Sequence, residues 1–97
     1  MPATITDPDD IFYMDGRIGS TYPANGKYTL EELQAIVDGP IEVVALPLPY
    51  YKGTCLLIVN EEGLLRDGLT FNEAASQLAG TYIVGNALVL TNIKRMG

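Results

Sequence analysis

The segment that runs from Thr29 to Leu46 constrains the fold more than any other part of the chain. Glu32 follows Thr29 at the spacing at which a hydroxyl and a carboxylate each accept a backbone N–H at the start of a helix. Apolar side chains then recur at helical spacing on one arc, at Leu30, Leu33, Ile36 and Val37. Gly39 predicts a left-handed helix end, and residues 41–46 have the composition of a strand. The segment therefore predicts an amphipathic helix followed directly by a strand.

The remaining elements are mainly strands. Residues 11–14 have strand composition and predict a short strand or hairpin followed by a Gly-rich loop. The unbroken apolar run at residues 55–59 favours a strand that is covered on both faces. A second Thr-x-x-Glu pattern begins at Thr70 and predicts a shorter helix that ends at Gly80. Two further strands are predicted at residues 81–84 and 87–91. We expect an α+β fold, a small mixed or antiparallel sheet of four to five strands with two helices packed on it.

The domain organisation follows from length and composition. A chain of 97 residues can form one hydrophobic core but not two. Residues 1–10 combine two prolines with acidic residues and show no periodicity, so we expect a flexible N-terminal arm. With 47% hydrophobic and 19% charged residues, the rest is too apolar for disorder. Residues 11–97 are therefore expected to form a single α+β domain.

The charge balance is acidic, with 12 Asp and Glu residues against 6 Lys and Arg and a formal charge of -6. Such a chain repels nucleic acid and anionic membranes on average, so we expect neither as a direct partner. The negative charge serves solubility in one interpretation and complements a basic partner in the other. The single Cys55 lies in an apolar run, and no stretch approaches the length of a membrane span. These features predict a cytoplasmic protein.

The sequence excludes several kinds of chemistry. It contains no histidine, which removes Ser-His-Asp and Cys-His catalysis and the common zinc sites, and it has no phosphate-binding Gly-rich loop. Two carboxylate pairs remain, Glu31 with Glu32 and Glu61 with Glu62. The first pair lies in the first turn of the predicted helix, where the helix dipole stabilises negative charge. The second pair is better explained as a solvated turn than as a metal site. We expect no enzymatic activity, no catalytic residue, no metal and no cofactor.

Tyr50, Tyr51 and Lys52 form the most distinctive polar group, at the tip of a proline-bounded loop. Two aromatic rings beside a cation can stack on a base or anchor a protein interface. In the alternative interpretation, one tyrosine folds over the sheet and the other is merely exposed. We predict a binding surface made of these three residues with Glu61 and Glu62. The other tyrosines, Tyr13, Tyr22, Tyr28 and Tyr82, are expected to be wall or core residues whose hydroxyls reach water.

Several short motifs occur in a fixed order between residues 29 and 90. They are Thr29-Leu-Glu-Glu-Leu-Gln34, Gly39, Ile41-Glu42, Asn60-Glu-Glu-Gly63, Asn72 and Ile83-Val-Gly85. Their order resembles that of a small domain of unknown function common in bacteriophages and mobile elements. The chain departs from that pattern in its longer Pro-rich loop and in its N-terminal arm. The resemblance implies an origin in such genomes, and it implies no activity that could be assigned to particular residues.

Two binding functions follow as hypotheses. Small, acidic, non-enzymatic proteins of such genomes resemble counter-defence factors, so the first is stoichiometric inhibition of a host or bacterial defence protein that carries a basic patch. In the second, a homo-oligomer sequesters a signalling nucleotide, with tyrosines stacking on the base and Arg17, Lys52 or Arg66 meeting phosphate. A structural or virion-associated role is a further alternative. A phage-encoded protein would act in the cytoplasm of the host cell.

Overall fold

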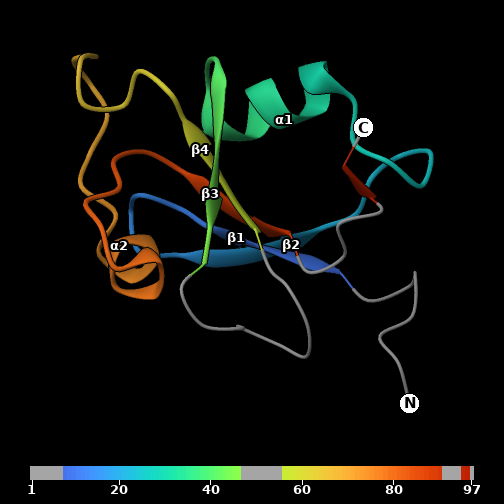
Figure 1. Cartoon of the computed structure of the whole chain (residues 1–97), viewed down its shortest axis with the longest axis horizontal. Helices are drawn as coiled ribbons and strands as arrows, with labels where there is room; N and C mark the ends of the chain where they lie inside the picture. The colour runs from blue at the N-terminus through green and yellow to red at the C-terminus, as the bar shows by residue number, and fades with distance from the viewer. Residues whose placement is uncertain (1–7, 47–55, 91–94, 97) are drawn as a thin grey trace.

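The computed structural model describes residues 8–46, 56–90 and 95–96. Its elements, in chain order, are β1 (Asp9–Phe12), β2 (Ile18–Thr21), α1 (Leu30–Val37), β3 (Ile41–Ala45), β4 (Leu56–Asn60), α2 (Glu73–Ala79) and β5 (Ala87–Leu90). The five strands form one antiparallel sheet in the order β2-β1-β5-β4-β3 (Figure 1). The predicted α+β class, with two helices and a five-stranded antiparallel sheet, is confirmed.

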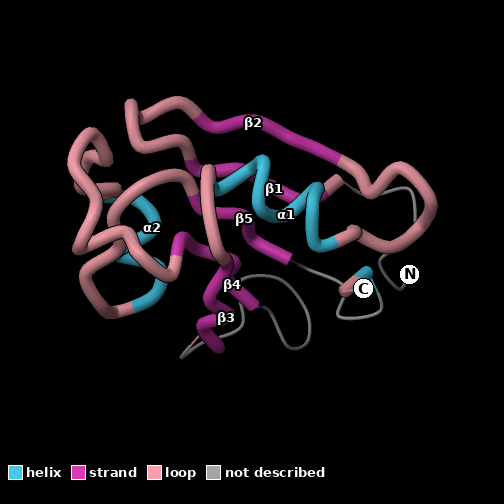
Figure 2. The backbone as a smooth tube through the Cα atoms, turned by 90° about the horizontal axis from the view of Figure 1, so that it is seen from above, coloured by secondary structure: helices cyan, strands magenta, loops and turns pink. Residues whose placement is uncertain are grey.

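The two helices cover opposite faces of the sheet, because successive residues of a strand point to opposite sides. Ile58 and Leu88 pack with Leu33 and Val37 of α1, whereas the alternate residues Leu57 and Val89 pack on the α2 side. Figure 2 shows α1 lying over the middle of the sheet and α2 at one end. Strands β4 and β5 are buried on both faces, which the unbroken apolar run at residues 55–59 predicts for β4.

The first helix begins as the sequence predicts and ends one residue earlier. Thr29 Oγ1 accepts the N–H of Glu32 at 3.1 Å, and Glu32 Oε1 accepts the N–H of Thr29 at 2.8 Å, which completes the capping box. The backbone N–H groups of Thr29 and Ala24, which both donate to the Glu32 carboxylate, hold the pKa of Glu32 below its usual value. The left-handed residue is Asp38, with φ 61°, and not Gly39. Aspartate tolerates this conformation better than most residues, so the helix stops before the glycine.

The second helix does not use the predicted Thr70–Glu73 box. Its N-cap is Asn72, whose Oδ1 accepts the N–H of Ala75 at 3.1 Å. The same side chain donates through Nδ2 to the carbonyl oxygens of Phe12 and Gly85, at 2.7 and 2.8 Å. Asn72 stabilises the start of the helix and also bonds it to two distant segments, whereas Thr70 would only cap the helix. The helix therefore begins after Asn72. Gly80 ends the helix in a left-handed conformation, as predicted.

The strand predicted at residues 81–84 is wrong. Within the described part of the chain this segment forms only an isolated bridge between Val84 and Phe71. Its backbone is held by the segment around α2 instead: Ser76 Oγ accepts the N–H of Ile83 at 2.8 Å, and the carbonyl of Ile83 accepts the N–H of Asn72 at 2.9 Å. Because these groups are already bonded, they do not extend the sheet.

Strand β1 begins two residues earlier than predicted. Asp9 and Asp10, which the sequence places in a flexible arm, pair with Thr21 and Ser20 of β2. The carboxylate of Asp9 is fully buried. Acidic residues are seldom buried unless they have partners, and composition does not show those partners. The first seven residues of the expected arm lie outside the described ranges.

Candidate functional site

The strongest candidate site is a hollow of about 370 Å³ on the α2 face of the sheet. We call it the Tyr82 groove. Its lining includes the side chains of Glu42, Val44, Glu61, Leu64, Leu65 and Tyr82. They come from β3, from the turn after β4 and from the segment after α2. The hollow is therefore made by segments that are far apart in the sequence.

A rigid turn presents the two leucines of the groove. Asn60 Oδ1 accepts the N–H of Glu62 at 2.7 Å, and Asn60 Nδ2 donates to the carbonyls at the end of α1. Gly63 approaches Val84 so closely that an added Cβ would lie 2.9 Å from its carbonyl oxygen. With the backbone held in this way, the next two side chains point outward: Leu64 is 71% exposed and Leu65 is 88% exposed.

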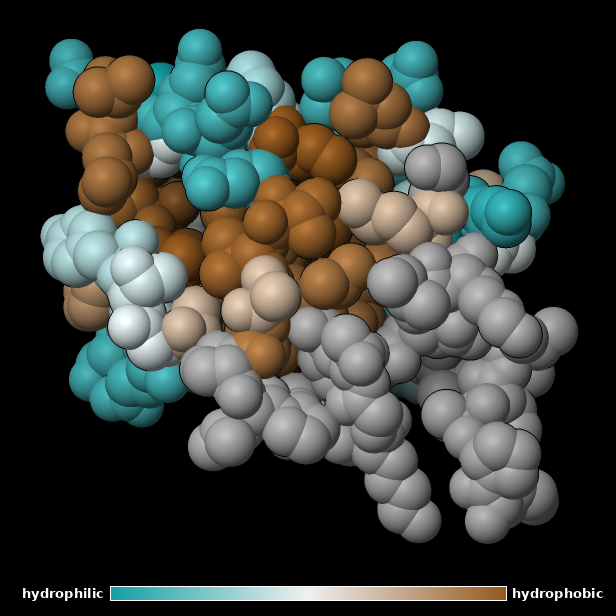
Figure 3. All heavy atoms as spheres, viewed as in Figure 1, coloured by the Kyte–Doolittle hydropathy of each residue, from teal (hydrophilic) through white to brown (hydrophobic). Residues whose placement is uncertain are grey.

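Tyr82 forms the opposite wall of the groove. The ring of Tyr82, which is 61% exposed, stacks on that of Phe71 with centroids 4.7 Å apart. The pair also borders a shallower hollow beside Ser76 and Gln77 of α2. In Figure 3, apolar side chains form a brown area over the middle of the molecule, where β3 and β4 run in Figure 1, and this area extends toward the turn after β4. Exposed apolar area of this kind is typical of contact surfaces.

The charge of the groove is uniformly negative among the described residues that line it. Glu42 and Glu61 are the charged members, and both carboxylates are exposed to solvent. Such a surface offers apolar contact at its centre and attraction for cationic groups at its margin.

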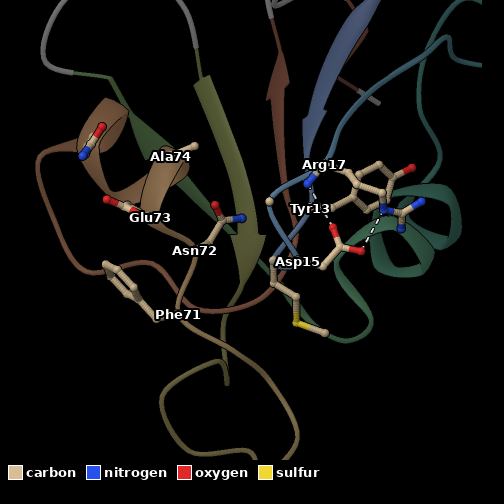
Figure 4. A pocket seen from close by; sticks show the side chains of 10 residues that line it. Tyr13, Asp15, Arg17, Phe71, Asn72, Glu73 and Ala74 are labelled. Atoms are coloured by element: carbon tan, nitrogen blue, oxygen red, sulfur yellow. Dashed lines mark hydrogen bonds and ion pairs between the residues drawn. The ribbon is translucent and has the colours of Figure 1, made fainter.

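A second hollow, of about 440 Å³, lies between the β1–β2 hairpin and the start of α2. Figure 4 shows Tyr13, Asp15 and Arg17 on one side of it and Phe71 and Glu73 on the other. Arg17 Nε lies 2.7 Å from Asp15 Oδ2, and its guanidinium stacks 4.7 Å from the centre of the Tyr13 ring. The hydrogen bonds from Arg17 hold the pKa of Asp15 below its usual value. The cation of this hollow is therefore engaged within its own hairpin.

A pair of charged side chains, Asp9 and Arg95, is buried together with Tyr28. Asp9 Oδ2 accepts from Tyr28 Oη at 2.6 Å and lies 3.0 Å from Arg95 Nη1. The exposed fractions of the three residues are 0%, 1% and 3% for Asp9, Tyr28 and Arg95, so no ligand reaches them. The backbone N–H of Tyr28 also donates to the carbonyl of Arg95 at 2.7 Å. We assign this buried ionic cluster to stability, because it joins β1 and the segment before α1 to the C-terminal segment.

The buried tyrosine is expected to make the stability of the fold decrease in alkaline solution. Burial and the Asp9 carboxylate raise the pKa of Tyr28 above its ordinary value of 10.0. The unfolded chain loses this proton above pH 10 whereas the folded chain keeps it, so the stabilising contribution is complete below that pH and declines above it. We expect an added slope of about 1.4 kcal/mol per pH unit above pH ~10, and Tyr28→Phe to lack it. Urea denaturation of both proteins from neutral to alkaline pH measures the slopes; parallel curves would contradict the expectation.

The predicted binding residues are only partly brought together. Glu61 lines the Tyr82 groove, whereas Glu62 is exposed in the same turn and accepts the N–H of Leu65 and Arg66 through its carbonyl. Tyr50, Tyr51 and Lys52 lie outside the described residues, as does Cys55, so their part in a surface stays a prediction.

The other tyrosines differ from one another. Tyr28 is a core residue, but its hydroxyl meets Asp9 and not water. Tyr13 is half-buried in the hairpin, Tyr22 is exposed, and Tyr82 is exposed but lines the Tyr82 groove. Sequence reasoning missed the role of Leu64, Leu65 and Tyr82. Two adjacent leucines within a Gly-bounded polar segment were the available signal.

Fold and site together define a small α+β domain with an antiparallel sheet between two short helices and an acidic, apolar groove. The chain belongs to the DUF3846 family, a domain of unknown function, which it matches over residues 11–96. Searches of curated proteins and of solved structures gave no match. Among the described residues, no group of three acidic or Cys side chains gathers as a metal site would require, and neither helix is long and apolar enough to cross a membrane.

Proposed function

We propose that this domain is a non-enzymatic binding protein that docks on another protein through the Tyr82 groove. The observation that carries the proposal is the exposure of Leu64, Leu65 and Tyr82 beside two carboxylates on a rigid frame. Solvent-exposed leucine pairs and aromatic rings lose contact with water when a partner covers them, which is the main source of binding free energy at interface centres.

The partner that fits this surface carries apolar side chains surrounded by lysine or arginine. Glu42 and Glu61 lie at the margin of the groove, and the whole chain has a charge of -6. Complementary charges raise the rate of association and select the partner, whereas the leucines and the tyrosine hold the complex together. The loop at residues 50–52 is proposed as a second part of the same contact.

In the finer form of the proposal, the partner is a defence protein of a bacterial host and the domain inhibits it stoichiometrically. This form is supported by the resemblance of the motif order to proteins of bacteriophages and mobile elements. The groove itself supports only the protein-binding part, because an acidic and apolar surface is compatible with many basic partners.

The nucleotide-binding alternative receives less support from the described residues. Of the three cations that could meet phosphate, Arg17 is paired with Asp15, and Arg66 donates to the backbone carbonyl and the carboxylate of Asp38. Lys52 lies outside the described ranges. A phosphate would have to displace existing carboxylate contacts in a chain that repels anions on average.

The proposal is tested by capture from a bacterial lysate followed by binding measurements with the purified captured protein. We expect Leu64→Ser with Leu65→Ser and Tyr82→Ser to weaken binding at least about 30-fold, the effect of losing interface hot spots. Glu42→Lys with Glu61→Lys is expected to slow association and to remove its dependence on salt. Surface plasmon resonance at several ionic strengths measures both effects.

The matched control is Ile18→Ser with Tyr22→Ser, because these residues are also exposed and apolar but lie at the opposite edge of the sheet, in and next to β2. It should bind like the original protein. If the groove variant and this control bind equally well, the Tyr82 groove is not the contact surface. A separate Tyr50→Ala with Tyr51→Ala variant tests the loop.

A further inference from the structure

Strand β3 is an edge of the sheet, and its outer side carries backbone groups that no described strand pairs with. The register joins Glu42 to Val59 and Val44 to Leu57, and the N–H of Glu61 donates to the carbonyl of Pro40 at 2.8 Å. Bonded and non-bonded pairs alternate along an antiparallel ladder. The N–H and C=O groups of Ile41, Val43 and Ala45 therefore point away from β4. Figure 2 shows β3 as the outermost magenta strand on that side.

This edge is complementary to itself. If a second copy pairs antiparallel with β3 around a two-fold axis at Val43, each Ile41 meets the Ala45 of the other copy and the two Val43 residues meet each other. All three outward residues then exchange hydrogen bonds. Each Glu42 lies opposite a Val44, so the carboxylates do not face one another across the pair. Val43, which is 44% exposed, packs on its own counterpart.

The opposite edge of the sheet is less suited to such pairing. On β2, the hydrogen bond from the N–H of Tyr13 to the carbonyl of Arg17 and the register with β1 leave Ile18 and Ser20 pointing outward. The residue between them is Gly19, against which the Tyr13 ring is packed so closely that an added Cβ would lie 2.8 Å from the ring. A two-fold axis there would bring together glycines, which have no side chain to bury.

We propose that the protein self-associates through β3, in the register centred on Val43, to give a continuous antiparallel sheet of two copies. This two-fold axis is perpendicular to the sheet, so the α2 faces of both copies lie on the same side. Glu42 and Val44 line the Tyr82 groove, and the pairing places the two grooves next to each other across the axis. The dimer thus presents a doubled contact surface, which would increase affinity for a partner with two matching sites.

The dimer should be weak and should respond to salt in a distinctive way. A five-residue strand covers less surface than the roughly 800 Å² per partner of a standard interface, so dissociation is expected in the micromolar range or above. Two chains of the same negative charge repel each other, and salt screens that repulsion. Self-association should therefore tighten as salt is added, whereas docking of a basic partner should weaken.

Sedimentation equilibrium of the full chain, from micromolar to near-millimolar concentration, tests the proposal. We expect a monomer–dimer equilibrium that Val43→Pro abolishes, because proline lacks the outward N–H but leaves the bonds to β4 intact. Ile18→Pro, at an outward position of the other edge, is the matched control and should dimerise normally. Circular dichroism confirms that each variant is folded.

A charge exchange tests the register without proline. Val43→Lys and Val43→Glu should each dimerise about fivefold or more weakly than the original chain, because like charges meet at the axis. Their equimolar mixture should recover association, since opposite charges then face each other. A chain that stays monomeric at every concentration, or a mixture that associates no better than its components, would overturn the proposal. Neither result bears on the groove, whose test uses the partner protein.

Discussion

Replacing Asp9 with asparagine is expected to lower the free energy of unfolding by about 3–5 kcal/mol, the largest effect of any single change considered for this domain. The substitution preserves shape but removes the charge that lies 3.0 Å from Arg95 Nη1 and 2.6 Å from Tyr28 Oη. Because both partners are buried, the Arg95 guanidinium loses its Asp9 counter-ion in a place where water does not replace it. A loss of this size is a large part of the stability of a small domain.

Urea or thermal denaturation measures this effect. The melting temperature should fall by roughly 15 °C or more, since about 1 kcal/mol corresponds to about 4–8 °C in a domain of this size. Asp15→Asn is the matched control: it also removes a carboxylate paired with an arginine, but at an exposed hairpin turn. Exposed pairs contribute little, so the control should be nearly unchanged. An Asp9→Asn protein as stable as the original would show that the buried ionic cluster does not stabilise the fold.

Replacing Asn72 with alanine is the second large expected effect, a loss of about 2–4 kcal/mol. Its side chain caps α2 and donates two buried hydrogen bonds, to the carbonyls of Phe12 and Gly85. The loss combines an N-cap, which contributes about 1 kcal/mol, with the cost of about 1–3 kcal/mol for buried acceptors deprived of this donor. No other side chain among the described residues links β1, α2 and the turn before β5 in this way.

The measurement is again chemical denaturation, with hydrogen exchange to locate the change. Exchange should rise first in α2 and in the neighbouring end of β1, because those segments lose their shared contact. Asn25→Ala, in an exposed turn, is the control and should alter stability by less than about 0.5 kcal/mol. If Asn72→Ala matched this control, capping and cross-linking by Asn72 would be excluded as a major source of stability.

The motif residues behind the family resemblance are explained by the fold. Asn60 closes the end of α1 and fixes the turn after β4, and Asn72 caps α2. Gly63 has no room for a side chain against Val84, and Gly85 adopts φ 90°. These residues shape the frame around the Tyr82 groove, whereas the exposed side chains that we propose as contacts lie between or beside them. Motifs of this kind identify the fold without identifying a ligand.

Local patterns predicted those elements whose stabilising contacts are themselves local. Thr29 and Glu32 bond to each other's backbone, so the start of α1 is visible in the sequence. Thr70 shows the same pattern, but Asn72 is the N-cap of α2, because its side chain also bonds to Phe12 and Gly85, which are distant in the sequence. Residues 81–84 have strand composition, yet the backbone N–H and carbonyl of Ile83 form hydrogen bonds with Ser76 and Asn72 and not with a strand. Composition does not reveal such long-range competition.

The candidate site was less predictable than the fold. Glu61 was identified from its turn, but nothing near it in the sequence shows that Tyr82 lies across the same hollow. The exposure of Leu64 and Leu65 depends on the turn being held by Asn60 and by the close approach of Gly63. The prolines and acidic residues around Asp9 predict a flexible arm, and its partner Arg95, almost a chain length away, gives no local sign of the pairing. Sites of this kind become visible only when tertiary contacts are known.

The position of β5 in the middle of the sheet has a consequence for synthesis in the cell. Until residues 87–90 leave the ribosome, the β1–β2 hairpin and the β3 and β4 strands have no strand to join them, since each pairs with β5 and not with the other. Nascent chains would therefore expose the apolar surfaces of both hairpins until β5 has emerged, and the sheet would then close in one concerted step. Ribosome-bound chains stalled before and after this strand should differ sharply in protease resistance.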